Sequence, residues 1–301
     1  REWFIETKGS NYIKGIHFLQ KIEGKTLGLL NNENTHIDSC TFDCDDGLLV
    51  KGLLDLYTNN KNVYIENCVF NHASTGVGGI WIREFYADQK TSNIIIDNCF
   101  MTSRSGVDEV LAIYGAHGTV ENVKVSNTTI ESTSAASMPH MISAGLGGIT
   151  KNVNFTGCTI RNNGASTSIF KNQPTGGGSS QFISIDNCII INTKENIRAI
   201  IGDVFVTNTK IYTSESIAFG FENSSHKTPI FYSCNFESEK QMHELLGTFK
   251  SCVFDMNELV SENYHVNSYG ITLRDCEING INCTGTLFSI TSIPIKFSSQ
   301  S

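Results

Sequence analysis

The 301-residue sequence has only four prolines, and charged side chains make up no more than 17% of it. With 40% apolar residues, the chain is too hydrophobic to stay disordered. It has no apolar stretch of the roughly 18–20 residues that a membrane span needs, so we expect no membrane contact. Basic residues are in the minority, and the formal charge of −8 argues against nucleic acid as a partner.

Two familiar patterns are also missing. The ten cysteines include no CxxC pair, which is the spacing of many redox and zinc sites. Arg1 is not an initiator residue and no signal-like segment follows it, so we expect the sequence to be a piece of a longer chain. Most of the cysteines recur at similar intervals, and this regularity indicates a repeat.

The repeat is a short motif of Asn, two residues, an apolar residue, a spacer, a small polar residue, Cys or Thr, any residue and an apolar residue. Clear copies are NTHIDSCTF (34–42), NVYIENCVF (62–70), NIIIDNCFM (93–101), NVKVSNTTI (122–130) and NVNFTGCTI (152–160). Shorter copies continue to residue 278. The Cys/Thr position defines a column of Ile16, Cys40, Cys68, Cys99, Thr128, Cys158, Cys188, Thr209, Cys234, Cys252 and Cys276, with steps of 18 to 31 residues.

Each copy alternates apolar and polar residues, which is typical of a half-buried strand. A single short strand cannot bury its apolar face, whereas parallel stacking of many copies builds a continuous core. We therefore predict an all-β fold, a single-stranded right-handed parallel β-helix of ten to eleven rungs that forms one domain over residues 1–301. A leucine-rich repeat is excluded because the LxxLxL skeleton is absent. Residues 240–250 are expected to form a helical turn.

The motif also predicts the corners and the interior of this coil. Asn and Asp at the motif ends tolerate left-handed backbone geometry and suit sharp turns between sheets. The column cysteines are expected to form a buried ladder of reduced thiols, because Cβ atoms one strand spacing apart lie slightly beyond disulfide range. Cys44 and Cys283 lie off the column, and the pattern leaves open whether they are buried.

A second strand in each rung carries the candidate catalytic residues. Aligned on their apolar residues, 42–52, 74–85 and 104–115 place Asp45 and Asp46 level with Asp108 and Glu109, two rungs apart. Gly78 and Gly79 would lie between these acidic pairs, where a sugar ring needs space. Two rungs span about 9.6 Å, close to the roughly 6.5–9.5 Å between the carboxyl groups of inverting glycosidases. Asp108 or Glu109 would be the general acid, and Asp46 or Asp45 the general base.

The same alignment gives a set of candidate substrate-binding residues. Lys51, Arg83 and Tyr114 form one column, in which the cations would bind acidic substituents or phosphate. Tyr114 and Trp81 would stack on sugar faces, and His117 would transfer protons. Structural interpretations remain open for three of these residues, with Arg83 and Glu84 as a solvated pair, Trp81 as packing and His117 as a turn residue. The acidic pairs could likewise be solvated turn residues.

No cofactor is required by the hydrolytic hypothesis. One alternative includes a metal, because Asp43, Asp45 and Asp46 would supply oxygen ligands for calcium in a lyase that uses an arginine base. This cluster lacks the spacing of a calcium-binding loop.

With these residues in view, the sequence resembles the pectate-lyase-like β-helix superfamily over essentially its whole length. The segment DEVLAIYGAHGTVENVKVSNTTI (108–130) is similar to segments of phage tailspike and neck-appendage proteins that act on Gram-positive cell walls. Asp45 and Asp46 also resemble the paired aspartates of polygalacturonases. The GHG and RIK elements of those enzymes are absent, and GAHG at 115–118 is the nearest equivalent.

The resemblance implies a homotrimeric protein on the virion surface that binds and degrades a host cell-surface glycan or wall teichoic acid. Hydrolysis by the paired carboxylates is our first functional hypothesis. A non-catalytic polysaccharide-binding spike and a secreted calcium-dependent polysaccharide lyase are the alternatives, because the β-helix fold supports all three activities.

Overall fold

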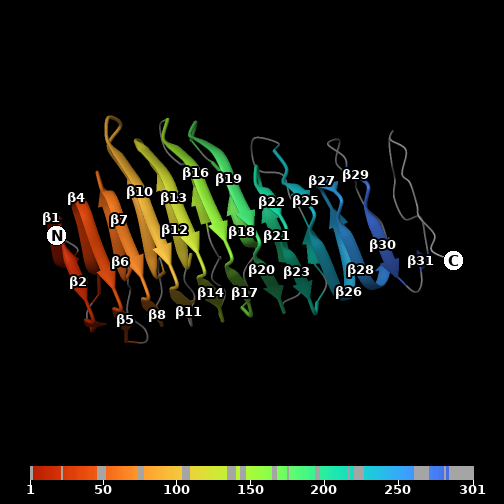
Figure 1. The fold of residues 1–301 in the computed structure, drawn as a ribbon, viewed down its shortest axis with the longest axis horizontal. Coiled ribbons are helices and arrows are strands. Elements are labelled where there is room, and N and C mark those ends of the chain that lie inside the picture. The colour runs from red at the N-terminus through yellow and green to blue at the C-terminus, as the bar shows by residue number, and fades with distance from the viewer. Residues whose placement is uncertain are drawn as a thin grey trace.

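The computed structural model describes residues 3–21, 23–45, 52–73, 78–103, 109–133, 140–142, 147–164, 168–174, 176–193, 197–215, 217–219, 227–260, 271–280 and 283–284. Within these ranges every regular element is a β-strand, and every strand pairs in parallel with strands one coil away. The strands lie side by side along the long axis of the molecule (Figure 1). The chain is therefore a right-handed parallel β-solenoid, as predicted.

Three stacks of strands, here named sheets A, B and C, form the walls of the solenoid. Sheet A contains β1 (Trp3–Gly9), β4 (Lys25–Asp38), β6 (Leu54–Thr58), β9 (Ile80–Glu84), β12 (Leu111–Gly115), β15 (His140–Ile142), β18 (Ser168–Asn172), β21 (Ile197–Ile201), β24 (Ile217–Phe219) and part of β26 (Asn235–Leu245).

Sheet B contains β2 (Tyr12–Lys14), the second half of β4, β7 (Lys61–Glu66), β10 (Lys90–Asp97), β13 (Thr119–Ser126), β16 (Ile149–Thr156), β19 (Ser179–Asp186), β22 (Phe205–Thr207), β25 (Ile230–Tyr232), β27 (Gly247–Lys250) and β29 (Ile271–Arg274). Sheet C contains β3 (His17–Gln20), β5 (Thr41–Cys44), β8 (Val69–His72), β11 (Phe100–Ser103), β14 (Thr129–Ser132), β17 (Thr159–Asn162), β20 (Ile189–Asn192), β23 (Lys210–Thr213), the first half of β26, β28 (Val253–Val260) and β30 (Glu277–Gly280). The short strand β31 (Cys283–Thr284) pairs with β28.

The regular part of the solenoid is shorter than predicted. From β6–β8 to β21–β23, each coil has three separate strands, one in each sheet, and this gives about six regular turns. The predicted ten to eleven rungs came from counting copies of the motif. Other copies lie in coils where one strand serves two sheets, as β4 and β26 do, or where further strands are irregular.

Alternating side chains explain why these segments form strands around one core. The inward residues stack with the same residue type or a similar one in the next coil. In sheet C, for example, the rings of Phe18, Phe42 and Phe70 are stacked with centroids 4.7 Å apart, one strand spacing. Such ladders bury apolar surface along the whole axis, so the core belongs to the stack and not to any single coil.

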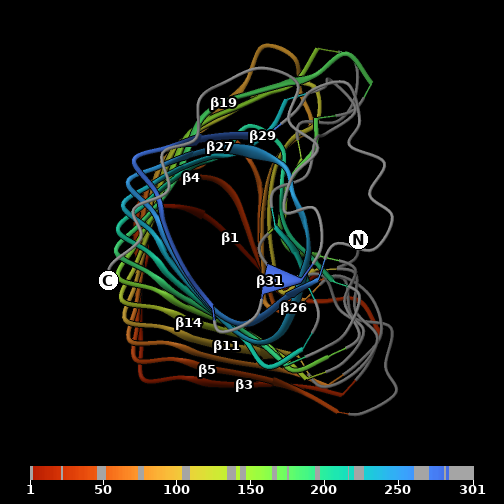
Figure 2. The same ribbon diagram turned by 90° about the vertical axis from the view of Figure 1, so that its right-hand side faces the viewer.

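The corner between sheets B and C has the predicted left-handed residues. Ser39, Asn67, Asn98 and Asn127 occupy this corner in successive coils, with φ between 50° and 57°. Asn98 donates a side-chain hydrogen bond to Asn67 at 2.8 Å, and each backbone N–H at the corner donates to the next coil. Asparagine tolerates this geometry better than most residues, so the repeated Asn fixes a sharp and superimposable turn (Figure 2).

The predicted cysteine ladder is confirmed for the described residues. Its cysteines are free thiols, and all are buried except the half-buried Cys276. Each thiol also joins coils, as when the backbone N–H of Cys158 donates to Sγ of Cys188 at 3.3 Å. Ile16 has the expected place in the stack but is exposed, whereas Cys44, off the column, is buried.

One predicted element is wrong. Residues 240–250 do not form a helical turn, because β26 continues to Leu245 and β27 follows at Gly247. In the ranges that the structure describes, there is no helix long and apolar enough to span a membrane.

Candidate functional site

The outer face of sheet A, near the N-terminal end of the solenoid, gathers aromatic and charged side chains. Ile80 and Ile82 of β9 point into the core and are fully buried, so Trp81 and Arg83 point outward. The pairings set Trp81 opposite Asp55 of β6 and Arg83 opposite Tyr114 of β12. Three successive coils therefore contribute to one surface.

This register corrects part of the predicted alignment. Arg83 and Tyr114 share a column as expected, but the neighbouring position in β6 belongs to Tyr57 and not to Lys51, because Leu56 pairs with Ile82. The run LLV at 48–50 has the same apolar character as Leu54–Tyr57, so the sequence pattern alone cannot choose between them. Lys51 lies outside the described residues.

At the centre of this surface is a buried ionic group. Arg83 donates from Nε to Asp55 Oδ1 at 2.8 Å and from Nη2 to Oδ2 at 2.6 Å, a bidentate pair. The ammonium group of Lys25 lies 3.1 Å from the same carboxylate. Asp55 is 0% exposed and Arg83 is 4% exposed, so the expectation that Arg83 and Glu84 form a solvated pair is wrong. Charges this deeply buried require such pairing.

Aromatic rings surround the guanidinium group. The Arg83 Cζ atom lies 3.7 Å from the ring centroid of Trp81, 4.6 Å from that of Tyr57 and 4.9 Å from that of Phe85. Phe85 stacks on Tyr57 at 5.5 Å and meets Tyr114 edge to face at 5.9 Å. Burial raises the pKa of the Tyr57 hydroxyl, which keeps it protonated near neutral pH. These four rings, here called the aromatic cluster, are half-buried. Cation–π contacts to Arg83 fix three of them, and Tyr114 is held by its contact with Phe85.

Asp45 and Glu109, the two described members of the predicted carboxylate pairs, are not in register. Asp45 is exposed and directly follows β5 of sheet C, with its backbone N–H donating to Gln20 O. Glu109 is half-buried and lies just before β12 of sheet A, where its carbonyl accepts from Gly78 N–H at 2.6 Å. Asp45 and Glu109 therefore occupy opposite ends of the connections from sheet C to sheet A. The other proposed catalytic residues, Asp46 and Asp108, lie outside the described residues.

The glycines between these acidic residues have a packing role. A Cβ atom on Gly78 would lie 2.8 Å from Cα of Val110 and would overlap the carbonyl of Glu109. A Cβ on Gly79 would lie 3.2 Å from Cβ of Phe70. Glycine is thus needed at Gly78 for the approach of the next coil, and the prediction that these residues make room for a sugar ring is wrong.

His117 lies in the tight turn between β12 and β13. Its backbone N–H donates to Glu84 O at 3.2 Å, and its side chain is half-buried. Glu84 is fully buried and accepts from the backbone N–H of Asn59 at 2.7 Å and of Tyr86 at 3.2 Å. The GAHG segment thus forms a rigid corner beside the aromatic cluster, which agrees with the structural interpretation of His117.

A metal site finds no support in the part of the chain that the structure describes, where no group of three or more His, Cys, Asp or Glu side chains converges. Asp43, one of the proposed calcium ligands, instead accepts from Asn71 at 2.7 Å and pairs with His17 at 2.5 Å.

Sequence reasoning missed four members of this surface: Lys25, Asp55, Tyr57 and Phe85. The signal for two of them is the alternation in LDLYT at 54–58, which matches that of IWIRE at 80–84. Lys25 gives no such signal, because a lysine that is 4% exposed is not expected from its sequence context.

These features define the chain as a parallel β-solenoid that presents an aromatic cluster, built around a buried ion pair, on one face. This architecture agrees with the β-helix superfamily at the level of the fold. Comparison with known proteins found no matching family model and no significantly similar curated protein or solved structure.

Proposed function

We propose that this protein binds an extended cell-surface polysaccharide, either a glycan or a wall teichoic acid, along the outer face of sheet A. The supporting observation is the aromatic cluster of four half-buried rings from three successive coils, in which Arg83 contacts three rings and Phe85 contacts the fourth, Tyr114. Half-buried rings from neighbouring coils offer apolar surface to successive units of a polymer that runs parallel to the solenoid axis.

The rigidity of this surface favours binding. The Asp55–Arg83 pair and the stacked Tyr57 and Phe85 rings are ordered by their own contacts, so little side-chain entropy is lost when a ligand arrives. The role of Arg83 in this proposal is to position the rings, since its guanidinium group is almost inaccessible to solvent.

Hydrolysis of the bound polymer is a second candidate function. It is favoured by the half-buried Glu109, which lies at the edge of the same sheet, two residues before the start of β12. In this proposal Glu109 or Asp108 is the general acid and Asp46 the base. Asp45 has no role in this proposal, because it lies at the end of sheet C and not beside sheet A. The remaining parts of the proposal are a homotrimeric state and a place on a phage appendage at the virion surface.

Binding is tested with purified Gram-positive wall teichoic acid and with a neutral wall glycan immobilised on a biosensor. Trp81→Ala and Tyr114→Ala should each weaken binding by about tenfold, as expected for a central aromatic contact. Phe205→Ala is the matched control, because Phe205 is an exposed ring on sheet B and its loss should have no effect. Unchanged binding in Trp81→Ala would refute the proposed surface.

Hydrolysis is tested by the release of reducing ends, or of phosphodiester fragments for teichoic acid. Glu109→Gln should abolish release while the affinity for the polymer remains. If the unmodified protein binds the polymer without shortening it, the protein is a binding spike. Unsaturated products that disappear in EDTA would instead identify the calcium-dependent lyase.

A further inference from the structure

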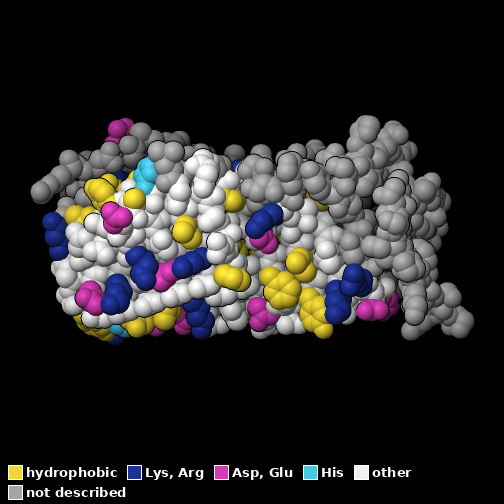
Figure 3. All heavy atoms as spheres, turned by 90° about the horizontal axis from the view of Figure 1, so that it is seen from above, with side chains coloured by type: hydrophobic (Ala, Val, Ile, Leu, Met, Phe, Trp, Pro, Cys, Tyr) yellow, Lys and Arg dark blue, Asp and Glu magenta, His cyan; other side chains and the backbone are white. Residues whose placement is uncertain are grey.

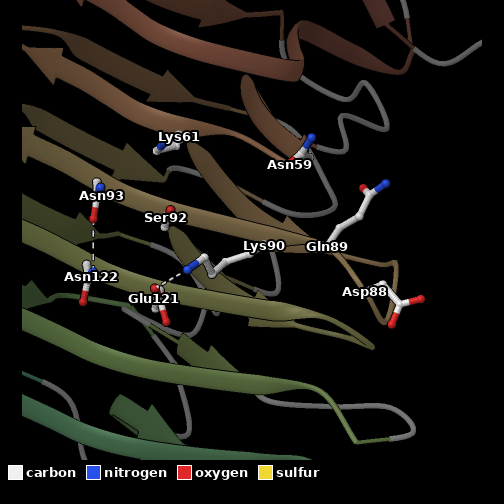
Figure 4. A pocket seen from close by; sticks show the side chains of 9 residues that line it. All are labelled: Asn59, Lys61, Asp88, Gln89, Lys90, Ser92, Asn93, Glu121 and Asn122. Carbon is white, nitrogen blue, oxygen red and sulfur yellow. Dashed lines mark hydrogen bonds and ion pairs between the residues drawn. The ribbon is translucent and has the colours of Figure 1, made fainter.

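A polar pocket lies at the corner between sheets A and B, away from the residues proposed above. Its volume is about 540 Å³, and strands β7, β10 and β13 contribute Lys61, Ser92, Asn93 and Asn122 to its lining (Figure 4). Ligand pockets typically have volumes of about 300–1,000 Å³. The cavity is therefore large enough for a sugar unit.

One wall of the pocket is a hydrogen-bonded turn. Residues 85–89 connect β9 to β10, and Asp88 and Gln89 of this turn line the pocket. The turn is closed by a hydrogen bond from Gln89 N–H to Tyr86 O at 3.0 Å. It packs directly on Gly118 of the next coil, where any Cβ atom would overlap the carbonyl oxygens of Tyr86 and Gln89. The wall is thus fixed by backbone packing.

The floor carries a ladder of asparagine amides at strand spacing. Asn122 donates to Asn93 at 3.1 Å, Asn93 donates to Asn62 at 3.0 Å, and Asn152 donates to Asn122 at 3.0 Å. All four residues have φ between 54° and 57°, which holds their side chains on the exposed surface. An amide has two N–H donors and two acceptor positions, so the ladder leaves Asn93 and Asn122 capacity to bond hydroxyl groups.

Charges around the pocket are balanced. Lys90 and Lys151 both pair with Glu121, at 2.9 Å and 3.0 Å, and this pairing lowers the pKa of Glu121, so the carboxylate stays ionised. Lys61 pairs with Glu33 at 3.3 Å. Basic and acidic side chains are likewise interspersed over the N-terminal half of the face seen in Figure 3. Amides and balanced charges suit hydroxyl groups and give an anion no net attraction.

We infer that this pocket binds one neutral sugar unit and is a saccharide subsite separate from the aromatic cluster. The inference takes its ligand class from the proposed function, but it depends on different residues. The turn 85–89 links the two surfaces, since Phe85 belongs to the cluster and Tyr86, 51% exposed, lies between Phe85 and the pocket residues of the same turn. A polymer lying on sheet A can therefore place a side branch or an end unit around this corner.

The test uses saturation-transfer NMR with D-glucose, D-galactose and N-acetyl-D-glucosamine, and with D-galacturonate as the anionic counterpart of galactose. At least one neutral sugar should bind, and galacturonate should bind more weakly than galactose. Asn93→Gly and Asn122→Gly keep the left-handed backbone but remove the amides, and each should weaken binding by about fivefold, the loss of roughly one net hydrogen bond. Asn152→Gly, in the same ladder but outside the pocket, is the matched control and should bind normally.

Trp81→Ala distinguishes this inference from the proposed function, because it should weaken polymer binding by about tenfold without changing monosaccharide binding in the pocket. The inference is overturned if none of the three neutral sugars binds, if galacturonate binds more tightly than galactose, or if Asn93→Gly and Asn152→Gly bind equally well. Loss of monosaccharide binding in Trp81→Ala would also overturn it, since the sugar would then occupy the aromatic cluster.

Discussion

The buried His72 should make the stability of the solenoid depend on pH. His72 is the last residue of β8, its side chain faces the core, and it is 0% exposed. Burial lowers its pKa from 6.5 to about 4. The folded state therefore keeps the imidazole neutral where the unfolded chain takes up a proton. Below about pH 6.5 the unfolded state binds more protons, so stability falls as the pH drops, and this loss levels off below about pH 4.

The size of the effect follows from this difference in pKa. At pH 4.5 the unfolded state gains about 2.5 kcal/mol from protonation of His72, at about 1.4 kcal/mol per pH unit between the two pKa values. Carboxylates also titrate in this range, so a matched variant is needed. His72→Asn is suitable, because Asn162 and Asn192 occupy equivalent positions in sheet C and are joined by a hydrogen bond of 2.9 Å.

Urea unfolding of both proteins, followed by far-UV circular dichroism at pH 7.5 and pH 4.5, measures the effect. The unmodified protein should lose about 2.5 kcal/mol more than His72→Asn between the two pH values. Equal losses would refute the reasoning, and so would an NMR titration of His72 in the folded protein with a midpoint near its ordinary value.

Three further predictions concern the packing of the coils. Asp55→Asn removes the carboxylate that both Lys25 and Arg83 contact, so the free energy of unfolding measured in urea should fall by about 3–5 kcal/mol. Glu33→Gln, in the exposed pair with Lys61, should lower it by at most about 1 kcal/mol. Equal losses would contradict the role of the buried group. In thermal unfolding, Cys188→Thr should be less destabilising than Cys188→Ala, since a threonine hydroxyl also accepts the N–H of the preceding coil, and the reverse order would contradict this bridging role. Gly118→Ala should lower the melting temperature by several degrees, because its Cβ would overlap backbone atoms of the neighbouring turn. An unchanged melting temperature would contradict the tight packing of the 85–89 turn on Gly118.

The coil itself could be predicted from the sequence because its signals are local and repeated. The motif fixes which side chains face inward, and the recurring Asn fixes the corner geometry, as at Asn67 and Asn98. The ladder of free thiols followed from the same repeat. The number of regular turns did not, because the motif marks one strand per coil and says nothing about whether β4 or β26 serves two sheets.

The candidate site was only partly predictable. Trp81, Arg83 and Tyr114 were identified on one face, and the pairings confirm the Arg83–Tyr114 column. The position given to Lys51 belongs to Tyr57, since two apolar segments close together in the chain fit the strand pattern equally well. A shift in register moves every side chain of the strand relative to its neighbours, so an error of this kind also separates Asp45 from Glu109.

The coil, its interior residues and its sharp corners were thus all predictable from the sequence, because each follows from short-range alternation and from backbone preferences of single residues. Other features depend on tertiary contacts: Asp55 meets Arg83 and Lys25 beside the aromatic cluster, and a turn packed on Gly118 forms one wall of a polar pocket. The physical reason is that contacts between coils depend on the register of residues about 25 to 30 positions apart, and that register is selected by packing over the whole stack.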